Sequence, residues 1–152
     1  MNQTISEINI SYKPIQQNRR LGTIRRSSDA YKVLKELYNQ DLINAREEFI
    51  ILYLNQGGKV LGYFKAFTGG ISSVTCDLKI ILGVGLKSLA TSVILSHNHP
   101  SGNLKPSSSD LNLTKRVAEG CKVMDIHLFD HLILSDEGYF SFADEGLLNE
   151  TG

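Results

Sequence analysis

Hydrophobic residues recur along this chain at two spacings, one typical of helices and one typical of strands. Ala30, Val33, Leu34 and Leu37 follow helical spacing, and the polar residues 27–29 before them are plausible N-cap residues. Short apolar runs rich in β-branched and aromatic residues predict strands. Helices are expected at 30–38, 77–89 and 107–124, and strands at 48–54, 59–67, 91–95, 126–134 and 139–142, with a further short strand at 71–75.

The order of these elements predicts an α/β fold with a mixed sheet flanked by helices. The runs 48–54 and 59–67 flank a Gly-containing turn, which favours a hairpin. The run 91–95 is β-branched and apolar throughout, as expected for a strand buried on both faces. With 152 residues, the chain can form one domain with its own core. We expect this domain at 28–152, after a basic and partly flexible arm at 1–27.

Charge is balanced over the whole chain but not along it. Lys+Arg and Asp+Glu number 16 each, so the net charge does not indicate a polyanionic partner. The arm holds five basic residues against Glu7 alone, a net charge of +4. It could contact nucleic acid phosphates, or it could be a solvated terminus. The basic residues of the arm are Lys13, Arg19, Arg20, Arg25 and Arg26.

The two cysteines and the lengths of the apolar runs indicate the cellular compartment of the protein. Cys76 and Cys121 do not form a CxxC pair, so neither a disulfide framework nor a thiolate zinc site is expected, and both are interpreted as buried small residues. No secretion signal is recognisable at the N-terminus, and no apolar run reaches the roughly 18 residues of a membrane helix. A cytoplasmic protein without membrane contact is expected.

The segment that begins at His97 has the pattern of a metal site. Side chains alternate across an extended chain, so His97 and His99 would project to the same side and could bind one ion. Asp110 follows after a Gly/Pro/Ser-rich loop and could fold back as a third ligand. Three protein ligands leave one position open, which is the arrangement of a catalytic zinc.

Hydrolysis at such a zinc also needs a general base. Zinc would lower the pKa of its bound water towards ~7, and Glu47 or Glu48, at the start of a predicted strand, could accept the proton. Either acid could equally be a solvated residue at a strand start. Ser107 lies three residues before Asp110, where its hydroxyl could stabilise an oxyanion or cap the helix N-terminus.

Three residues of the strand 126–134 are weaker candidates. His127 and His131 are interpreted as structural. Asp130 could support the metal ligands through a hydrogen bond. Strand parity separates Asp130 from His131 unless a bulge intervenes.

These residues resemble a known family. The segment HNHPSG at 97–102, followed by PSSSD at 106–110, resembles the JAMM/MPN+ motif in the form found in RadC-like bacterial proteins. The similarity extends to Arg46-Glu47-Glu48-Phe49, Thr114, Asp130-His131-Leu132-Ile133 and Ser141-Phe142, and covers residues 28 to 146.

The resemblance implies a cytidine-deaminase-like JAB/MPN fold. It implies zinc on His97, His99 and Asp110, with Glu47 as general acid/base and Ser107 assisting the tetrahedral intermediate of peptide or isopeptide hydrolysis. Glu48 is the alternative to Glu47. RadC-like proteins commonly have Pro-Arg-Glu where this chain has Leu78-Lys79-Ile80.

Three hypotheses for the function follow. The first is a zinc metallohydrolase that acts on a peptide or protein substrate. The second is a DNA-repair or DNA-associated accessory protein that keeps the zinc without hydrolysis and contacts DNA through the basic arm. RadC-like proteins often also have a helix-hairpin-helix region suggestive of DNA binding, which a chain of this length is not expected to include. The third is an MPN-type scaffold without metal.

Overall fold

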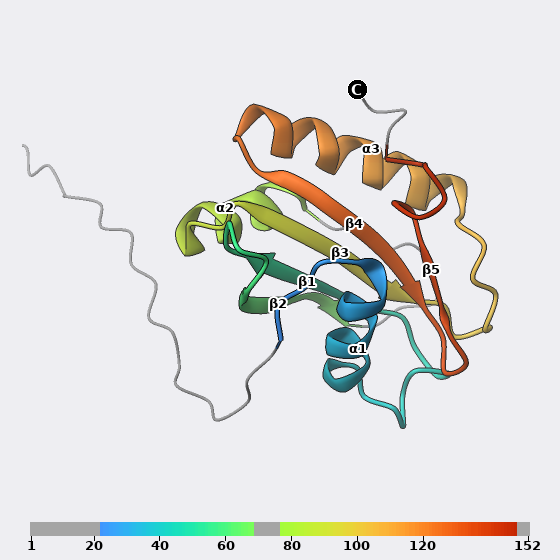
Figure 1. Cartoon of the computed structure of the whole chain (residues 1–152). Coiled ribbons are helices and arrows are strands. Elements are labelled where there is room, and N and C mark those ends of the chain that lie inside the picture. The colour runs from blue at the N-terminus through green and yellow to red at the C-terminus, as the bar shows by residue number, and fades with distance from the viewer. Residues whose placement is uncertain (1–21, 69–76, 149–152) are drawn as a thin grey trace, which may run out of the picture.

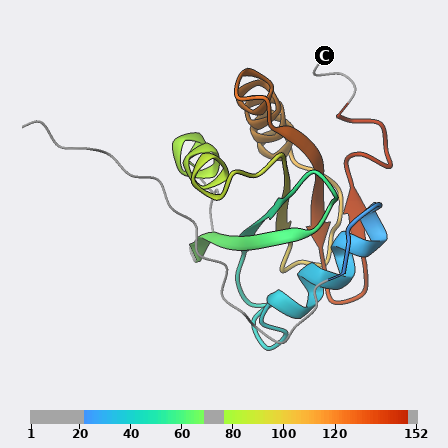
Figure 2. The same cartoon turned by 60° about the vertical axis from the view of Figure 1, so that its left-hand side comes forward.

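The computed structural model describes residues 22–68 and 77–148, and these form three layers with the sheet in the middle (Figures 1 and 2). The predicted order of elements is confirmed, as is the mixed α/β sheet. The helices are α1 (Ser27–Leu37), α2 (Leu78–Ser88) and α3 (Ser108–Val123). The strands are β1 (Glu48–Leu54), β2 (Val60–Thr68), β3 (Ser92–Asn98), β4 (His127–Leu134) and β5 (Tyr139–Ser141). The short strand expected at 71–75 lies outside the described residues.

The sheet has the strand order β2-β1-β3-β4-β5. Only β3 and β4 are parallel, because α3 carries the chain from one to the other. The hairpin of β1 and β2 turns through residues 55–58, where Gly58 adopts a positive φ of 77° that favours glycine. Since β1 runs antiparallel to β3, Phe49 at the start of β1 pairs with His97 at the end of β3.

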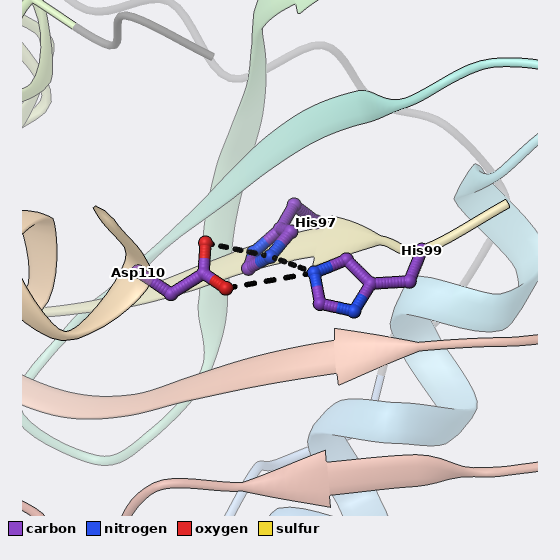
Figure 3. Close-up of side chains that lie close together, drawn as sticks. All are labelled: His97, His99 and Asp110. Carbon is purple, nitrogen blue, oxygen red and sulfur yellow. Dashed lines mark hydrogen bonds and ion pairs between the residues drawn. The ribbon is translucent and has the colours of Figure 1, made fainter. Parts of the chain in front are cut away.

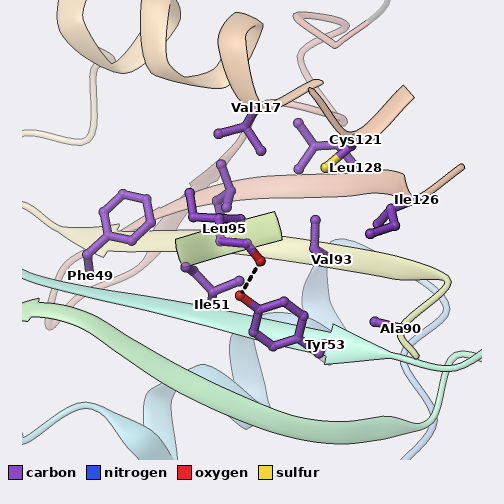
Figure 4. Packing of buried hydrophobic residues seen from close by; sticks show 11 residues of the cluster. Phe49, Ile51, Tyr53, Ala90, Val93, Leu95, Val117, Cys121, Ile126 and Leu128 are labelled. Carbon is purple, nitrogen blue, oxygen red and sulfur yellow. Dashed lines mark hydrogen bonds between the residues drawn. The ribbon is translucent and has the colours of Figure 1, made fainter. Parts of the chain in front are cut away.

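Each face of the sheet has its own hydrophobic core. Helices α2 and α3 cover one face, where Tyr53 of β1 also donates a hydrogen bond of 2.9 Å to the carbonyl of Ile81 (Figure 4). Helix α1 covers the other face through Ala30 and Leu34. Burial on both faces explains why β1 and β3 are nearly continuous apolar runs.

The predicted cap of α1 was wrong. Helix α1 begins at Ser27 with Arg26 at the N-cap and no side-chain cap, because the polar residues have other partners. The Ser27 hydroxyl donates to Asp144 at 2.5 Å, and the Asp29 carboxylate accepts from the backbone N–H of Arg25 at 3.1 Å. Ile24, which precedes α1, is buried in the core that α1 covers.

Candidate metal centre

Two imidazoles and one carboxylate converge at the edge of the sheet where β3 ends (Figure 3). His97 is the last residue but one of β3, His99 follows that strand, and Asp110 lies in the first turn of α3. The Nε2 atoms of the two histidines are 3.0 Å apart. The Asp110 carboxylate oxygens lie 3.2 Å from His97 Nε2 and 3.5 Å from His99 Nε2. One possible ligand atom from each of the three residues lies within 4.8 Å of the others, and no other group among the described residues is placed to hold a metal ion.

The strand connection explains this convergence. A parallel crossover from β3 through α3 to β4 places the end of β3 beside the start of α3. The His97 ring is held against the sheet by Phe49, with parallel rings whose centroids are 5.8 Å apart. His97 is 1% exposed and Asp110 is half-buried, so the possible ligand atoms are largely shielded from solvent.

A capping box fixes the orientation of Asp110. Its Oδ2 accepts the backbone N–H of Ser107 at 2.7 Å, while the Ser107 hydroxyl oxygen accepts the backbone N–H of Asp110 at 3.1 Å. The capping alternative for Ser107 is therefore confirmed. The same bond directs the Asp110 carboxylate towards the two histidines.

The donor set fits a cation. The Nδ1 of His99 contacts the carbonyl oxygen of Asn103, which can only accept, so the proton of a neutral His99 sits on Nδ1 and its lone pair on Nε2. That lone pair faces His97 Nε2 and the Asp110 carboxylate, an arrangement that needs a positive charge between the three donors. Two nitrogens and one oxygen are ligands that zinc commonly takes.

The pKa values of Asp110 and His99 are both shifted by their contact with each other. Burial raises the pKa of Asp110, but its close contacts with the Nε2 atoms of His97 and His99 lower it more, and the net result lies well below its usual value. The hydrogen bond to Asp110 raises the pKa of His99 against the opposing effect of burial, and the negative charge of Glu47 adds a smaller contribution. A proton and a metal ion therefore compete for His99.

The two acids at the start of β1 have different surroundings. Glu48 is buried on the α1 side of the sheet, 3.3 Å from the Arg46 guanidinium and 4.0 Å from the Lys65 ammonium. Glu47 is half-buried and lies two residues before Phe49, whose ring stacks on that of His97. Its negative charge is one of the smaller contributions to the raised pKa of His99.

Asn98 ties β3 to the segment that carries Glu47. It is fully buried, and its amide donates to the carbonyls of Ile43 at 2.7 Å and Arg46 at 2.9 Å. Its Oδ1 accepts the backbone N–H of Glu48 at 2.7 Å. The role of Asn98 was missed in the sequence because nothing in the spacing shows that residues 43–48 return to the end of β3.

Strand β4 contains a bulge that alters the predicted facing of its polar residues. Val93 pairs with Leu128 but Ile94 pairs with Asp130, so Phe129 is the additional residue. The bulge turns His131 towards His97, 2.9 Å from its Nδ1. The suggestion that Asp130 supports the ligands was wrong, since Asp130 instead accepts from Ser141 and from backbone N–H groups.

The remaining predicted residues that the structure describes lie away from this centre. His127 is exposed at the start of β4, and Cys121 is buried in the α3 core as expected. Burial raises the pKa of the Cys121 thiol to about 11. Arg25 and Arg26 lie at the start of α1, whereas Cys76, Arg19 and Arg20 are outside the described residues. No helix in the described ranges 22–68 and 77–148 is long and apolar enough to cross a membrane.

A mixed sheet with this convergence of His, His and Asp defines an α/β domain with a candidate metal centre. A family model described as RadC-like JAB domain matches residues 24–147, and the chain belongs to this family. The fold is consistent with a JAB/MPN domain.

Relatives with similar sequences carry the name UPF0758. One from Porphyromonas gingivalis is 41% identical over 136 residues, which are 89% of this chain and 59% of that protein. One from Aquifex aeolicus is 37% identical over 126 residues, or 83% of this chain and 53% of that protein. UPF0758 protein YfjY of Escherichia coli is 41% identical over 103 residues, 68% of this chain and 64% of that protein. The chain thus spans less than two thirds of the length of these relatives.

Proposed function

We propose that this protein is a zinc-dependent metallohydrolase of JAMM type that cleaves peptide or isopeptide bonds. The observation that carries the proposal is the convergence of His97, His99 and Asp110. Three nitrogen and oxygen ligands suit a catalytic zinc with one open position. When bound, zinc would polarise the scissile carbonyl and lower the pKa of a water molecule.

Glu47 is the proposed general base. Its negative charge contributes to the raised pKa of His99, and alternation of side chains favours the side of the sheet that Phe49 faces. In the proposed reaction its carboxylate accepts a proton from the attacking water and returns that proton to the leaving amine. Glu48 does not suit this role, because its carboxylate is buried on the opposite side of the sheet with Arg46 and Lys65.

Ser107 is proposed to stabilise the oxyanion while it caps α3. Its hydroxyl oxygen uses a lone pair to accept the Asp110 N–H, which leaves the hydroxyl proton free to donate. The side chain is exposed at the edge of the site, where a substrate can approach it. The capping and catalytic alternatives for Ser107 are therefore compatible.

The first test is metal content. Elemental analysis of the purified protein is expected to give one zinc per chain in the wild type and none in the double variant His97→Ala/His99→Ala. Equal metal in both would remove the basis for the hydrolase and favour the scaffold without metal.

The second test is turnover of a library of peptides and isopeptide-linked conjugates by the zinc-loaded protein. Glu47→Gln is expected to retain zinc and lose turnover, whereas Glu119→Gln, an exposed residue of α3, should behave as the wild type. A zinc-loaded wild type that cleaves nothing in the library but binds DNA would favour the DNA-associated alternative, with Arg19, Arg20, Arg25 and Arg26 as the contacts to mutate.

A further inference from the structure

A continuous chain of hydrogen bonds runs from the backbone of α3 to Nδ1 of His97, the ring nitrogen opposite the one that faces the other ligands. The Thr114 hydroxyl lies 2.7 Å from the carbonyl oxygen of Asp110 and 2.7 Å from His131 Nδ1. His131 Nε2 in turn lies 2.9 Å from His97 Nδ1. All three side chains are at least 97% buried, so water does not substitute for these bonds.

The direction of each bond follows from what its atoms can donate. A carbonyl oxygen only accepts, so the single proton of the Thr114 hydroxyl is used by Asp110. The contact between Thr114 and His131 then needs a proton on His131 Nδ1, with the Thr114 oxygen as acceptor.

Burial decides the state of the other nitrogen of His131. This ring is fully buried and none of its hydrogen bonds is to a carboxylate, so the charged form is disfavoured. A neutral ring with its proton on Nδ1 has its lone pair on Nε2. His131 Nε2 therefore accepts from His97 Nδ1, which leaves the lone pair of His97 on Nε2, the atom that faces His99 and Asp110.

We propose that Thr114 and His131 are positioning residues that hold His97 in the Nδ1–H tautomer, so that its Nε2 lone pair is available to a metal ion. The inference rests on the proposed metal centre. His99 obtains the same tautomer from the carbonyl of Asn103, so both histidines present Nε2 to the ion. Because Thr114 also binds the carbonyl of Asp110, one hydroxyl links two of the three ligands.

The Thr114→Val substitution tests this directly, because valine keeps the shape of threonine and lacks the oxygen. His131 Nδ1 would lose its acceptor, and the ring would be free to carry its proton on Nε2 and donate to His97 Nδ1. His97 would then be protonated on Nε2, where it blocks the metal. Thr114→Ser restores the hydroxyl and is expected to restore the wild-type tautomer.

Two measurements are expected to respond together. In metal-free protein labelled with 15N-histidine, NMR should show the His97 proton on Nδ1 in the wild type and in Thr114→Ser, and a shift towards Nε2 in Thr114→Val. Zinc affinity, measured by competition with a chelator, should fall about 10- to 100-fold in Thr114→Val, the usual effect of removing a partner of a metal ligand. His127→Gln, at the exposed start of the same strand, should change neither.

The outcomes separate this inference from the proposed function. A wild type with the His97 proton on Nε2 in the metal-free protein would overturn the inference, and this measurement needs no variant to fold. Wild-type zinc affinity and tautomer in folded Thr114→Val would also overturn it. A wild type with the proton on Nδ1 that binds no zinc would support the tautomer assignment and contradict the proposed hydrolase.

Discussion

Asn98 binds the backbone on both sides of Glu47, through the carbonyl of Arg46 and the N–H of Glu48. The residue between the two proposed histidine ligands thus fixes the segment that carries the proposed base. One buried amide therefore holds the backbone around Glu47 against the end of β3.

Replacing Asn98 by Ala should therefore destabilise the fold strongly. The change leaves two carbonyls and one N–H without their partner, and each buried unsatisfied group costs about 1–3 kcal/mol. We expect the free energy of unfolding, measured with urea, to fall by roughly 3 kcal/mol or more. Asn44→Ala, which removes an exposed hydrogen bond to Asp136, should cost well under half of that amount. Equal losses in the two variants would contradict the role given to Asn98.

Substitutions at Ser107 and Asp110, the two members of the capping box, should have different effects on metal binding. Asp110→Asn keeps an oxygen that can accept the Ser107 N–H but removes the negative charge beside the histidines, so stoichiometric zinc should be lost while the helix cap is retained. Ser107→Ala should retain zinc and lower the free energy of unfolding by about 1 kcal/mol, as usual for a lost cap. Elemental analysis measures the zinc content and urea unfolding measures the stability. Loss of zinc in Ser107→Ala with zinc retained in Asp110→Asn would contradict the assignment of Asp110 as the metal ligand.

The two glycines of α2 should respond differently to alanine. A Cβ at Gly83 would meet no atom within 4 Å, so Gly83→Ala should raise the free energy of unfolding by about 1 kcal/mol through helix propensity alone. A Cβ at Gly85 would lie 3.2 Å from Ile126 Cδ1 and 3.5 Å from the Tyr53 ring, so Gly85→Ala should gain less or lose stability. Thermal unfolding of the two variants checks the order, and a larger gain for Gly85→Ala would show that this packing is loose.

Asp130 should make the stability depend on pH. Burial raises the pKa of its carboxyl above its usual value, against opposing hydrogen bonds from Ser141 and from backbone N–H groups. A raised folded-state pKa means that the contribution of Asp130 to stability is fully present below the unfolded-state pKa and is lost as pH rises through the folded-state pKa.

The Asp130→Asn variant isolates this effect, because asparagine does not titrate. The difference in unfolding free energy, wild type minus variant, should decrease as the pH rises from about 4, the unfolded-state pKa of an aspartate. Urea unfolding at a series of pH values measures this difference. An increase with pH would mean that the hydrogen bonds to Asp130 outweigh its burial.

The elements and the candidate ligands were determined by the sequence itself. Apolar spacing located the described helices and strands to within a few residues, because the side of an element that is buried must be hydrophobic in every such fold. The residues His97, His99 and Asp110 could also be named from their types and spacing. Glu47 could not be separated from Glu48 by spacing, since both stand at a strand start.

Only the tertiary structure decided which polar groups surround the candidate metal centre. The bulge at Phe129 turns His131 rather than Asp130 towards His97, and the pattern of residues 126–134 gives no sign of it. Asn98 reaches residues 43–48 only because β1 pairs antiparallel with β3. Ser27 leaves the predicted cap because Asp144, 117 residues away, accepts its hydroxyl. Periodicity reports which side of an element is buried, whereas the partner of a buried polar group is set by strand pairing between distant segments.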